Sequence, residues 1–230
     1  MQQEAKNTNS RRSVLLGLGA AVAGATVVSA RSVNAQTGSS GFQPARHQVD
    51  AWFDEIPGEH RVFIDTATAN GGAEGILYAG NLWNARRTAY AGESADFAMV
   101  LCFRHLSTPF AFNDAIWEKY GQVFNALMQM PDPNTGVAPT FNLMRSAEYG
   151  LRLPNLGTTL DQVIDLGVQI AICDAATQFV SNQIAQATGG SLEIIYGELK
   201  NNAISGRFVS AGVMALTRAQ EYGYSVLIAG

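Results

Sequence analysis

Cysteine and histidine are both scarce in this sequence, which has two cysteines and three histidines among its 230 residues. Two cysteines in a domain of this size are not a disulfide framework, so a single bridge or two free thiols is expected. The histidines are far apart, and neither C-x-x-C nor H-x-x-x-H is present. A zinc or haem site would need such clustered ligands. We therefore expect no metal and no cofactor.

Charged residues are also few, at 15% of the chain, and the two signs are unequal once the first 35 residues are set aside. Residues 36–230 contain 11 basic and 18 acidic side chains, which gives a net charge of 11 minus 18, or −7. Binding to nucleic acid or to an anionic membrane depends on clustered Lys and Arg. No G-x-G-x-x-G or P-loop motif is present, and Gly71-Gly72 alone is a weak phosphate signal. Nucleic acid is therefore excluded as a partner.

The first 35 residues resemble a cleavable export signal. A polar start and Arg11-Arg12 precede an apolar stretch of 17 residues, Val14 to Ala30, and Val33-Asn34-Ala35 fits a cleavage site. The paired arginines and the Gly- and Ala-rich stretch favour the twin-arginine route, which predicts a periplasmic protein beginning near Gln36. The alternative is an uncleaved anchor, but a spanning helix needs roughly 20 apolar residues. We expect no stable membrane association after cleavage.

Strand-like apolar runs alternate with helix-like patterns in residues 59–230, which we expect to form one domain. They follow residues 36–58, whose Gly, Ser and Pro content predicts a flexible tether. The alternation predicts a three-layer α/β/α fold with a five-stranded parallel sheet. The expected strands are residues 60–66, 96–103, 168–173, 192–196 and 224–228, and the expected helices are residues 73–91, 113–128, 158–164, 175–187 and 210–222.

Three other stretches lack regular periodicity. Residues 69–72 predict a turn, and residues 104–109 predict a polar loop. Residues 131–160 contain four prolines and three glycines, too many for a long regular element. We expect an ordered insertion over about residues 106–160, or a flap, before the third strand. The short helix that ends this part of the chain is expected to be capped by Thr158 or Thr159.

Three stretches resemble the DsrE/DsrF-like family, which includes sulfur-relay subunits: residues 61–90, residues 167–176 and residues 218–224. The chain is most similar to the exported, twin-arginine branch of that family. The resemblance implies a five-stranded parallel sheet and assembly into an oligomer, and we expect a homo-oligomer. In the sulfur-relay members a cysteine just after the third strand carries a persulfide, and Cys173 falls at that position. The resemblance therefore implies a small sulfur-containing ligand.

The candidate site follows from the expected sheet, because the carboxyl ends of parallel strands meet at one edge. Cys173 is the candidate catalytic residue. At the start of a helix, its thiolate would be favoured by the positive end of the helix dipole, and nearby Arg104 or protonated His105 would act in the same direction. Asp174 would oppose them. The candidate ligand-binding residues at this edge are Asp65, Thr66, Thr68, Asn70, Arg104, His105 and Asp174, and Ser107, Thr108, Tyr196 and Glu198 are expected there too.

Each candidate also has a simpler structural interpretation. Free cysteine is among the most buried residue types, so Cys173 and, more so, Cys102 can be inert core thiols. A bridge between them is not expected, because disulfides across adjacent strands are sterically uncommon and need Cα atoms within about 7 Å. His105 can be an acid/base group, a metal ligand, an anion contact or a loop histidine bonded to backbone. The aromatic residues between 110 and 124 are expected in the core or at a subunit contact.

Two functions stay open at this point. The first is an exported DsrE-like protein that handles persulfide sulfur or thiol redox chemistry through Cys173. The second is a non-catalytic module that binds a small ligand or forms an oligomer, with Cys173 only packed. A hydrolase using Ser107 or Ser210 has no G-x-S-x-G motif to support it.

Overall fold

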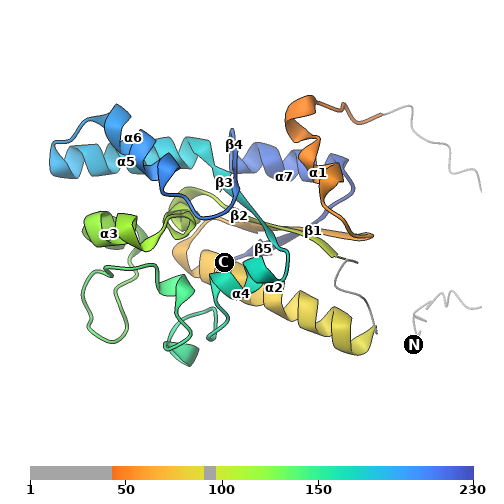
Figure 1. Cartoon of the computed structure of the whole chain (residues 1–230), viewed down its shortest axis with the longest axis horizontal. Coiled ribbons are helices and arrows are strands. Elements are labelled where there is room, and N and C mark those ends of the chain that lie inside the picture. Colours follow the sequence, from red (N-terminus) through yellow and green to blue (C-terminus); the bar gives the residue numbers. More distant parts are fainter. Residues whose placement is uncertain (1–42, 91–96) are drawn as a thin grey trace, which may run out of the picture. The chain divides into compact units, whose positions relative to one another are not determined.

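Five parallel strands form one sheet in the part of the chain that the computed structural model describes, residues 43–90 and 97–230 (Figure 1). The expected five-stranded parallel sheet is confirmed. The expected export signal and the first residues of the tether lie outside the described residues. The order of the strands is β4-β3-β2-β1-β5, and their bounds are β1 (His60–Thr66), β2 (Phe97–Phe103), β3 (Gln169–Cys173), β4 (Arg207–Val209) and β5 (Ser225–Ala229).

Helices cover both faces of the sheet, which gives the three layers that the alternating pattern predicts. Figure 1 shows α1 and α7 on one side of the strands and α2 and α4 on the other. Among the described residues, no helix combines the length and the apolar character that crossing a membrane requires. The bounds of the helices are α1 (Trp52–Glu55), α2 (Ala69–Ala89), α3 (Asp114–Met128), α4 (Leu160–Asp165), α5 (Asp174–Thr188), α6 (Leu192–Asn201) and α7 (Gly212–Glu221).

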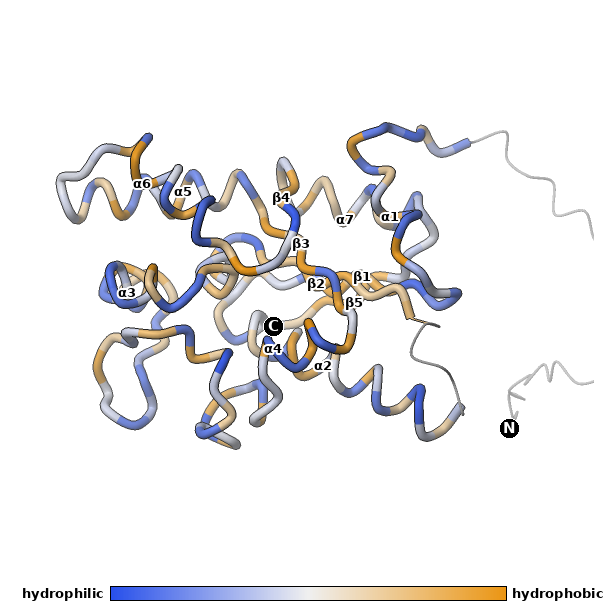
Figure 2. Tube along the Cα trace, in the orientation of Figure 1, coloured by the Kyte–Doolittle hydropathy of each residue, from blue (hydrophilic) through white to orange (hydrophobic). Residues whose placement is uncertain are grey.

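Neighbouring residues of the inner strands enter two different hydrophobic cores, which explains the nearly continuous apolar runs. Ile64 belongs to the core shared with α2, whereas Phe63 belongs to the core under α7. Figure 2 shows the hydrophobic residues concentrated in β1, β2 and β5. The predicted core position of the aromatic residues is confirmed, because Trp117 and Phe124 are buried with ring centroids 4.9 Å apart.

The expected strand at residues 192–196 is wrong. These residues begin α6, in which Ile195 and Leu199 are buried four positions apart, as one face of a helix requires. The run Leu-Glu-Ile-Ile-Tyr has strand propensity, but packing of this helical face against α5 decides the structure. The fourth strand is β4 instead, and its three residues, one of them charged, are too short to give a periodic signal.

The flexible tether predicted through residue 58 is contradicted from Gln48 onward. Gln48–Asp50 forms a 3-10 helix, η1, and α1 follows it directly. Trp52 and Phe53 are buried in the core under α7, where the ring of Phe53 lies 5.3 Å from that of Tyr224. Two large aromatic side chains bury enough apolar surface to fix a short segment onto the domain. The folded unit is Gln43–Gly230.

Smaller differences concern the turn and the loop. α2 begins at Ala69, so residues 69–72 are its first turn, and residues 105–111 form a 3-10 helix, η3 (His105–Ala111). The predicted insertion is ordered: it contains α3 and two further 3-10 helices, η4 (Leu143–Arg145) and η5 (Gly150–Arg152). α4 has a capping box in which Thr159 accepts a hydrogen bond from Gln162 N, so Thr159, not Thr158, is the cap.

Candidate functional site

Cys173 lies at the carboxyl end of β3 and is also the N-cap of α5. Its Sγ accepts a hydrogen bond from the backbone N–H of Ala176, at 3.3 Å, in the first turn of α5. It accepts a second one from the N–H of Gly212, at 3.2 Å, the first residue of α7. The sulfur is therefore held between the amino-terminal ends of two helices, where the sequence predicts only one. Backbone N–H groups at helix starts carry partial positive charge, so both favour a negatively charged sulfur.

A glycine is needed where α7 meets Cys173. A Cβ placed on Gly212 would lie 2.7 Å from Cβ of Arg104 and 3.1 Å from Sγ of Cys102. Without that Cβ, the start of α7 packs against both side chains and reaches the sulfur. Nothing in the sequence indicates this role of Gly212, because it lies 39 residues after Cys173 and belongs to no motif.

Arg104 and Asp65 form a bidentate ion pair beside Gly212. Arg104 Nε and Nη2 each lie 2.7 Å from an Asp65 carboxylate oxygen. Asp65 is 1% exposed, whereas the Arg104 side chain is 24% exposed. The hydrogen bonds to Asp65 raise the pKa of Arg104 above its ordinary value, and burial opposes that shift. The sequence predicts both residues at this edge, but the ion pair directs most of the guanidinium toward the protein interior.

A buried polar cluster fixes the chain that follows β2. Thr66 Oγ1 lies 2.8 Å from both the Cys102 carbonyl oxygen and Ser107 Oγ. Ser107 Oγ in turn accepts a hydrogen bond from Arg104 N at 3.0 Å. Thr66 and Ser107 are completely buried. Thr66 therefore fixes the chain around Cys102 and Ser107 by hydrogen bonds and is not available to a ligand. Ser107 is inaccessible as a nucleophile, which removes one of the two serines considered for a hydrolase.

Asp174 faces α6 and makes three hydrogen bonds. Its carboxylate accepts from Tyr196 Oη at 2.7 Å, from Lys200 Nζ at 2.8 Å and from Gln178 Nε2 at 2.9 Å. Burial by itself disfavours the charged carboxylate, but these hydrogen bonds outweigh it and lower the pKa of Asp174 below its ordinary value. Because Lys200 pairs with Asp174, the negative charge next to Cys173 is compensated. The sequence predicts Tyr196 at this edge, on a strand, but it gives no signal for Lys200.

Three further predicted residues, Thr68, Asn70 and His105, lie at the edge without contacting the sulfur. Thr68 is the N-cap of α2, where it accepts a hydrogen bond from Gly71 N at 2.8 Å, and Asn70 is exposed in the next turn. Both follow β1, which β2 separates from β3. His105 is exposed and has a left-handed backbone with φ of 53°. Glu198 is not at the edge but turned toward α3, where Lys119 and Tyr120 donate to its carboxylate.

Cys102 is a free thiol and so is Cys173. Cys102 is in register with Ala171, so Cys173 lies two residues further along β3 on the same face of the sheet. Burial, and then the negative charge of Asp65 and the proximity of the second thiol, raise the pKa of Cys102 well above its ordinary value. Cys102 is therefore a neutral thiol of the core, as the simpler interpretation expects.

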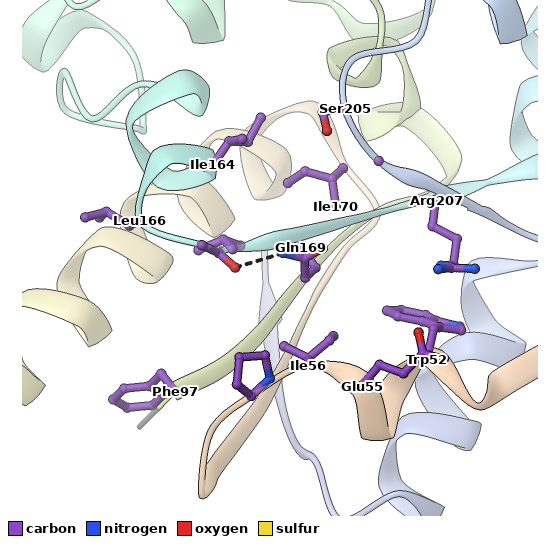
Figure 3. A pocket seen from close by; sticks show the side chains of 14 residues that line it. Trp52, Glu55, Ile56, Phe97, Ile164, Leu166, Gln169, Ile170, Ser205 and Arg207 are labelled. Carbon is purple, nitrogen blue, oxygen red and sulfur yellow. Dashed lines mark hydrogen bonds between the residues drawn. The ribbon is translucent and has the colours of Figure 1, made fainter. Parts of the chain in front are cut away.

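A large cleft lies at the opposite edge of the sheet, near the amino ends of β2 and β3. It has a volume of about 780 Å³ and is bordered by α1, by the turn before β3 and by the residues before β4. Figure 3 shows Arg207 above the indole of Trp52, with Ile170 and Gln169 along the strand. The guanidinium carbon of Arg207 lies 5.3 Å from the Trp52 ring centroid. The sequence could not indicate this cleft, because it combines the supposed tether with the unpredicted β4.

Two further kinds of evidence bear on the site: groups of possible metal ligands and similarity to known proteins. Within residues 43–90 and 97–230, no group of three or more His, Cys, Asp and Glu side chains is placed to hold a metal ion. No protein-family model matches the chain, and neither the curated proteins nor the solved structures contain a match. The family resemblance of the sequence therefore stays a prediction.

Proposed function

We propose that the protein is an exported, DsrE-like sulfur carrier in which Cys173 holds the transferred sulfur as a persulfide. The observation that carries this proposal is the pair of backbone N–H groups, from Ala176 and Gly212, that point at Cys173 Sγ. A neutral thiol is only a weak acceptor for such donors, whereas a thiolate is a strong one and is stabilised by them. The five-stranded parallel sheet, with this cysteine as the last residue of the third strand, supports the DsrE-like assignment.

The chemistry is an exchange between a donor persulfide and the Cys173 thiolate. The thiolate attacks the outer sulfur of the donor, R–S–SH, and the sulfur–sulfur bond of the donor breaks. The donor leaves as the thiolate R–S⁻, and Cys173 becomes Cys–S–SH, so no external oxidant or reductant is needed. Attack by an acceptor thiolate on the new persulfide passes the outer sulfur on and restores the Cys173 thiolate.

The surrounding charges have positioning roles. The Asp65–Arg104 ion pair holds the side-chain stem of Arg104 against Gly212, which keeps α7 next to the sulfur. Lys200 compensates the charge of Asp174, which would otherwise repel a thiolate one residue away. Both ion pairs balance charges near Cys173, where the two helix starts contribute partial positive charge.

A competing function is a non-catalytic module with an inert Cys173. The observation that favours it is burial, because Cys173 is only 6% exposed. The two functions differ in whether a small persulfide reaches the sulfur in the native protein.

Persulfide loading tests the proposal directly. We expect incubation with glutathione persulfide, followed by desalting and intact mass measurement, to add one sulfur atom that dithiothreitol removes. Peptide mapping should place it on Cys173, Cys102→Ala should load like the wild type, and Cys173→Ser should not load. Absence of the added sulfur in the folded wild type, or equal loading of Cys173→Ser, would contradict the sulfur-carrier function and favour the non-catalytic module.

The export part of the proposal has its own test. The receptor of the twin-arginine route recognises the arginine pair itself and not positive charge in general. We expect the protein in the periplasmic fraction to begin near Gln36, and a variant with Arg11→Lys and Arg12→Lys to accumulate uncleaved inside the cell. Unchanged export of that variant would contradict the twin-arginine assignment without affecting the chemistry proposed for Cys173.

A further inference from the structure

The two edges of the sheet are protected very differently. β4 is three residues long and carries the charged Arg207, and both features discourage pairing with another strand. β5 has five residues, Ser225–Ala229, and none of them is ionisable. Among the described residues, only β1 pairs with β5, and no backbone hydrogen bond from any other element reaches it. One long side of β5 is thus an uncharged row of N–H and C=O groups that no residue of 43–90 or 97–230 pairs with.

The side chains of β5 add an uncovered apolar surface to this edge. Val226 and Ile228 are in register with Phe63 and Asp65 of β1. Phe63 is completely buried under α7, but Ile228 is 69% exposed. The helical layer on this face therefore covers β1 and stops short of the carboxyl half of β5. An exposed isoleucine beside an unpaired edge is costly in water unless something packs on it.

We infer that β5 pairs with β5 of a second copy of this chain, antiparallel and across a two-fold axis. Centred on Leu227, this pairing places Leu227 opposite its own copy and Val226 opposite Ile228 of the other strand. The outermost pairs join Ser225 to Ala229. Every opposed pair lacks charge, so two copies of an acidic chain approach each other here without meeting like charges on the strand. The two sheets become one continuous sheet.

A second copy of β5 covers the exposed edge of both chains in a single interface. In an isologous interface each copy supplies the same surface, so one exposed edge and one exposed isoleucine per chain are both covered at once. The inference is independent of the proposed sulfur chemistry. It does place the interface beside the Asp65–Arg104 ion pair, because Asp65 and Ile228 are register partners.

The mass of the protein in solution tests the interface. We expect light scattering during gel filtration to give the mass of two chains for the wild type and of one chain for Ile228→Lys. The Ile228 side chain is exposed in the single chain, so this variant should keep the wild-type circular dichroism. Ile194→Lys is the matched control, because Ile194 is 71% exposed but lies on α6, and it should stay dimeric. A single-chain wild type, or a dimeric Ile228→Lys, would overturn the inference.

Cross-linking tests the register. In a background with Cys102→Ala and Cys173→Ser, we expect a short bifunctional thiol reagent to join two copies of Leu227→Cys, because directly opposed residues of antiparallel strands have Cβ atoms roughly 5 Å apart. Ser225→Cys is the control, since it faces Ala229 of the other copy rather than its own counterpart. Equal cross-linking of Ser225→Cys, or none of Leu227→Cys, would rule out this pairing.

Discussion

The backbone N–H of Gly212 donates a hydrogen bond to Cys173 Sγ at 3.2 Å, and so the first residue of α7 holds the last residue of β3. This contact brings a second helix start to the sulfur. It depends on the missing side chain of Gly212, since a Cβ there would meet Arg104 and Cys102. The proposed chemistry and the packing of α7 therefore depend on one position.

Gly212→Ala should both destabilise the protein and weaken the sulfur site. The added Cβ would lie 2.7 Å from Arg104 Cβ, so α7 must shift away, and we expect a loss of about 1–3 kcal/mol in the free energy of unfolding. Urea denaturation measures that loss, and persulfide loading should fall with it. Gly197→Ala on α6 is the control, because its Cβ meets nothing within 4 Å. It should gain about 0.5–1 kcal/mol from helix propensity. Equal effects of both substitutions would contradict the close packing at Gly212.

The carboxyl edge of the sheet could be predicted from sequence, and the two-helix arrangement could not. Apolar runs that end in polar residues locate Asp65, Arg104 and Cys173 at strand ends, because a parallel sheet needs such runs. The contact from Gly212 is a tertiary contact between residues 39 positions apart, with no local pattern to indicate it. α6 was misassigned for a related reason, since burial of Ile195 and Leu199 overrides the strand propensity of the same segment.

Arg104→Gln should cost far more stability than loss of an exposed ion pair. It leaves the carboxylate of Asp65, which is 1% exposed, without its charged partner, and breaking a buried pair in this way costs about 3–5 kcal/mol. Chemical denaturation at neutral pH measures the difference. Arg145→Gln is the control, because Arg145 and Asp161 are 34% and 48% exposed, and such pairs contribute about 0–1 kcal/mol. If the two variants lose similar stability, Asp65 is not held as a buried charge.

Asp174 should make the stability of the protein sensitive to acid. Its pKa is lower in the folded chain than in the unfolded chain, so its contribution is complete above the unfolded value of about 3.9. That contribution is lost as the pH falls from there through the folded value. We expect Asp174→Asn to be less stable than the wild type near pH 6 and to approach it in acid, as measured by urea denaturation over this range. Glu118→Gln, an exposed change on α3, controls for loss of a negative charge. If the free energies of unfolding of Asp174→Asn and the wild type differ by the same amount at every pH, the pKa of Asp174 does not contribute to stability in this way.

Alkylation should separate the two cysteines. Burial and then the charge of Asp65 raise the pKa of Cys102, so it stays a neutral thiol at neutral pH and cannot act as a nucleophile. We expect iodoacetamide to label Cys173 in the native protein and to label Cys102 only after unfolding in urea, with peptide mass spectrometry reporting both sites. Cys102→Ala should therefore leave native labelling unchanged, whereas Cys173→Ser should abolish it. Labelling of Cys102 in the folded chain would show that this strand opens. If Cys173 resists the reagent in the native protein but reacts in the unfolded chain, the two N–H contacts have only a structural role. That result would favour the non-catalytic module.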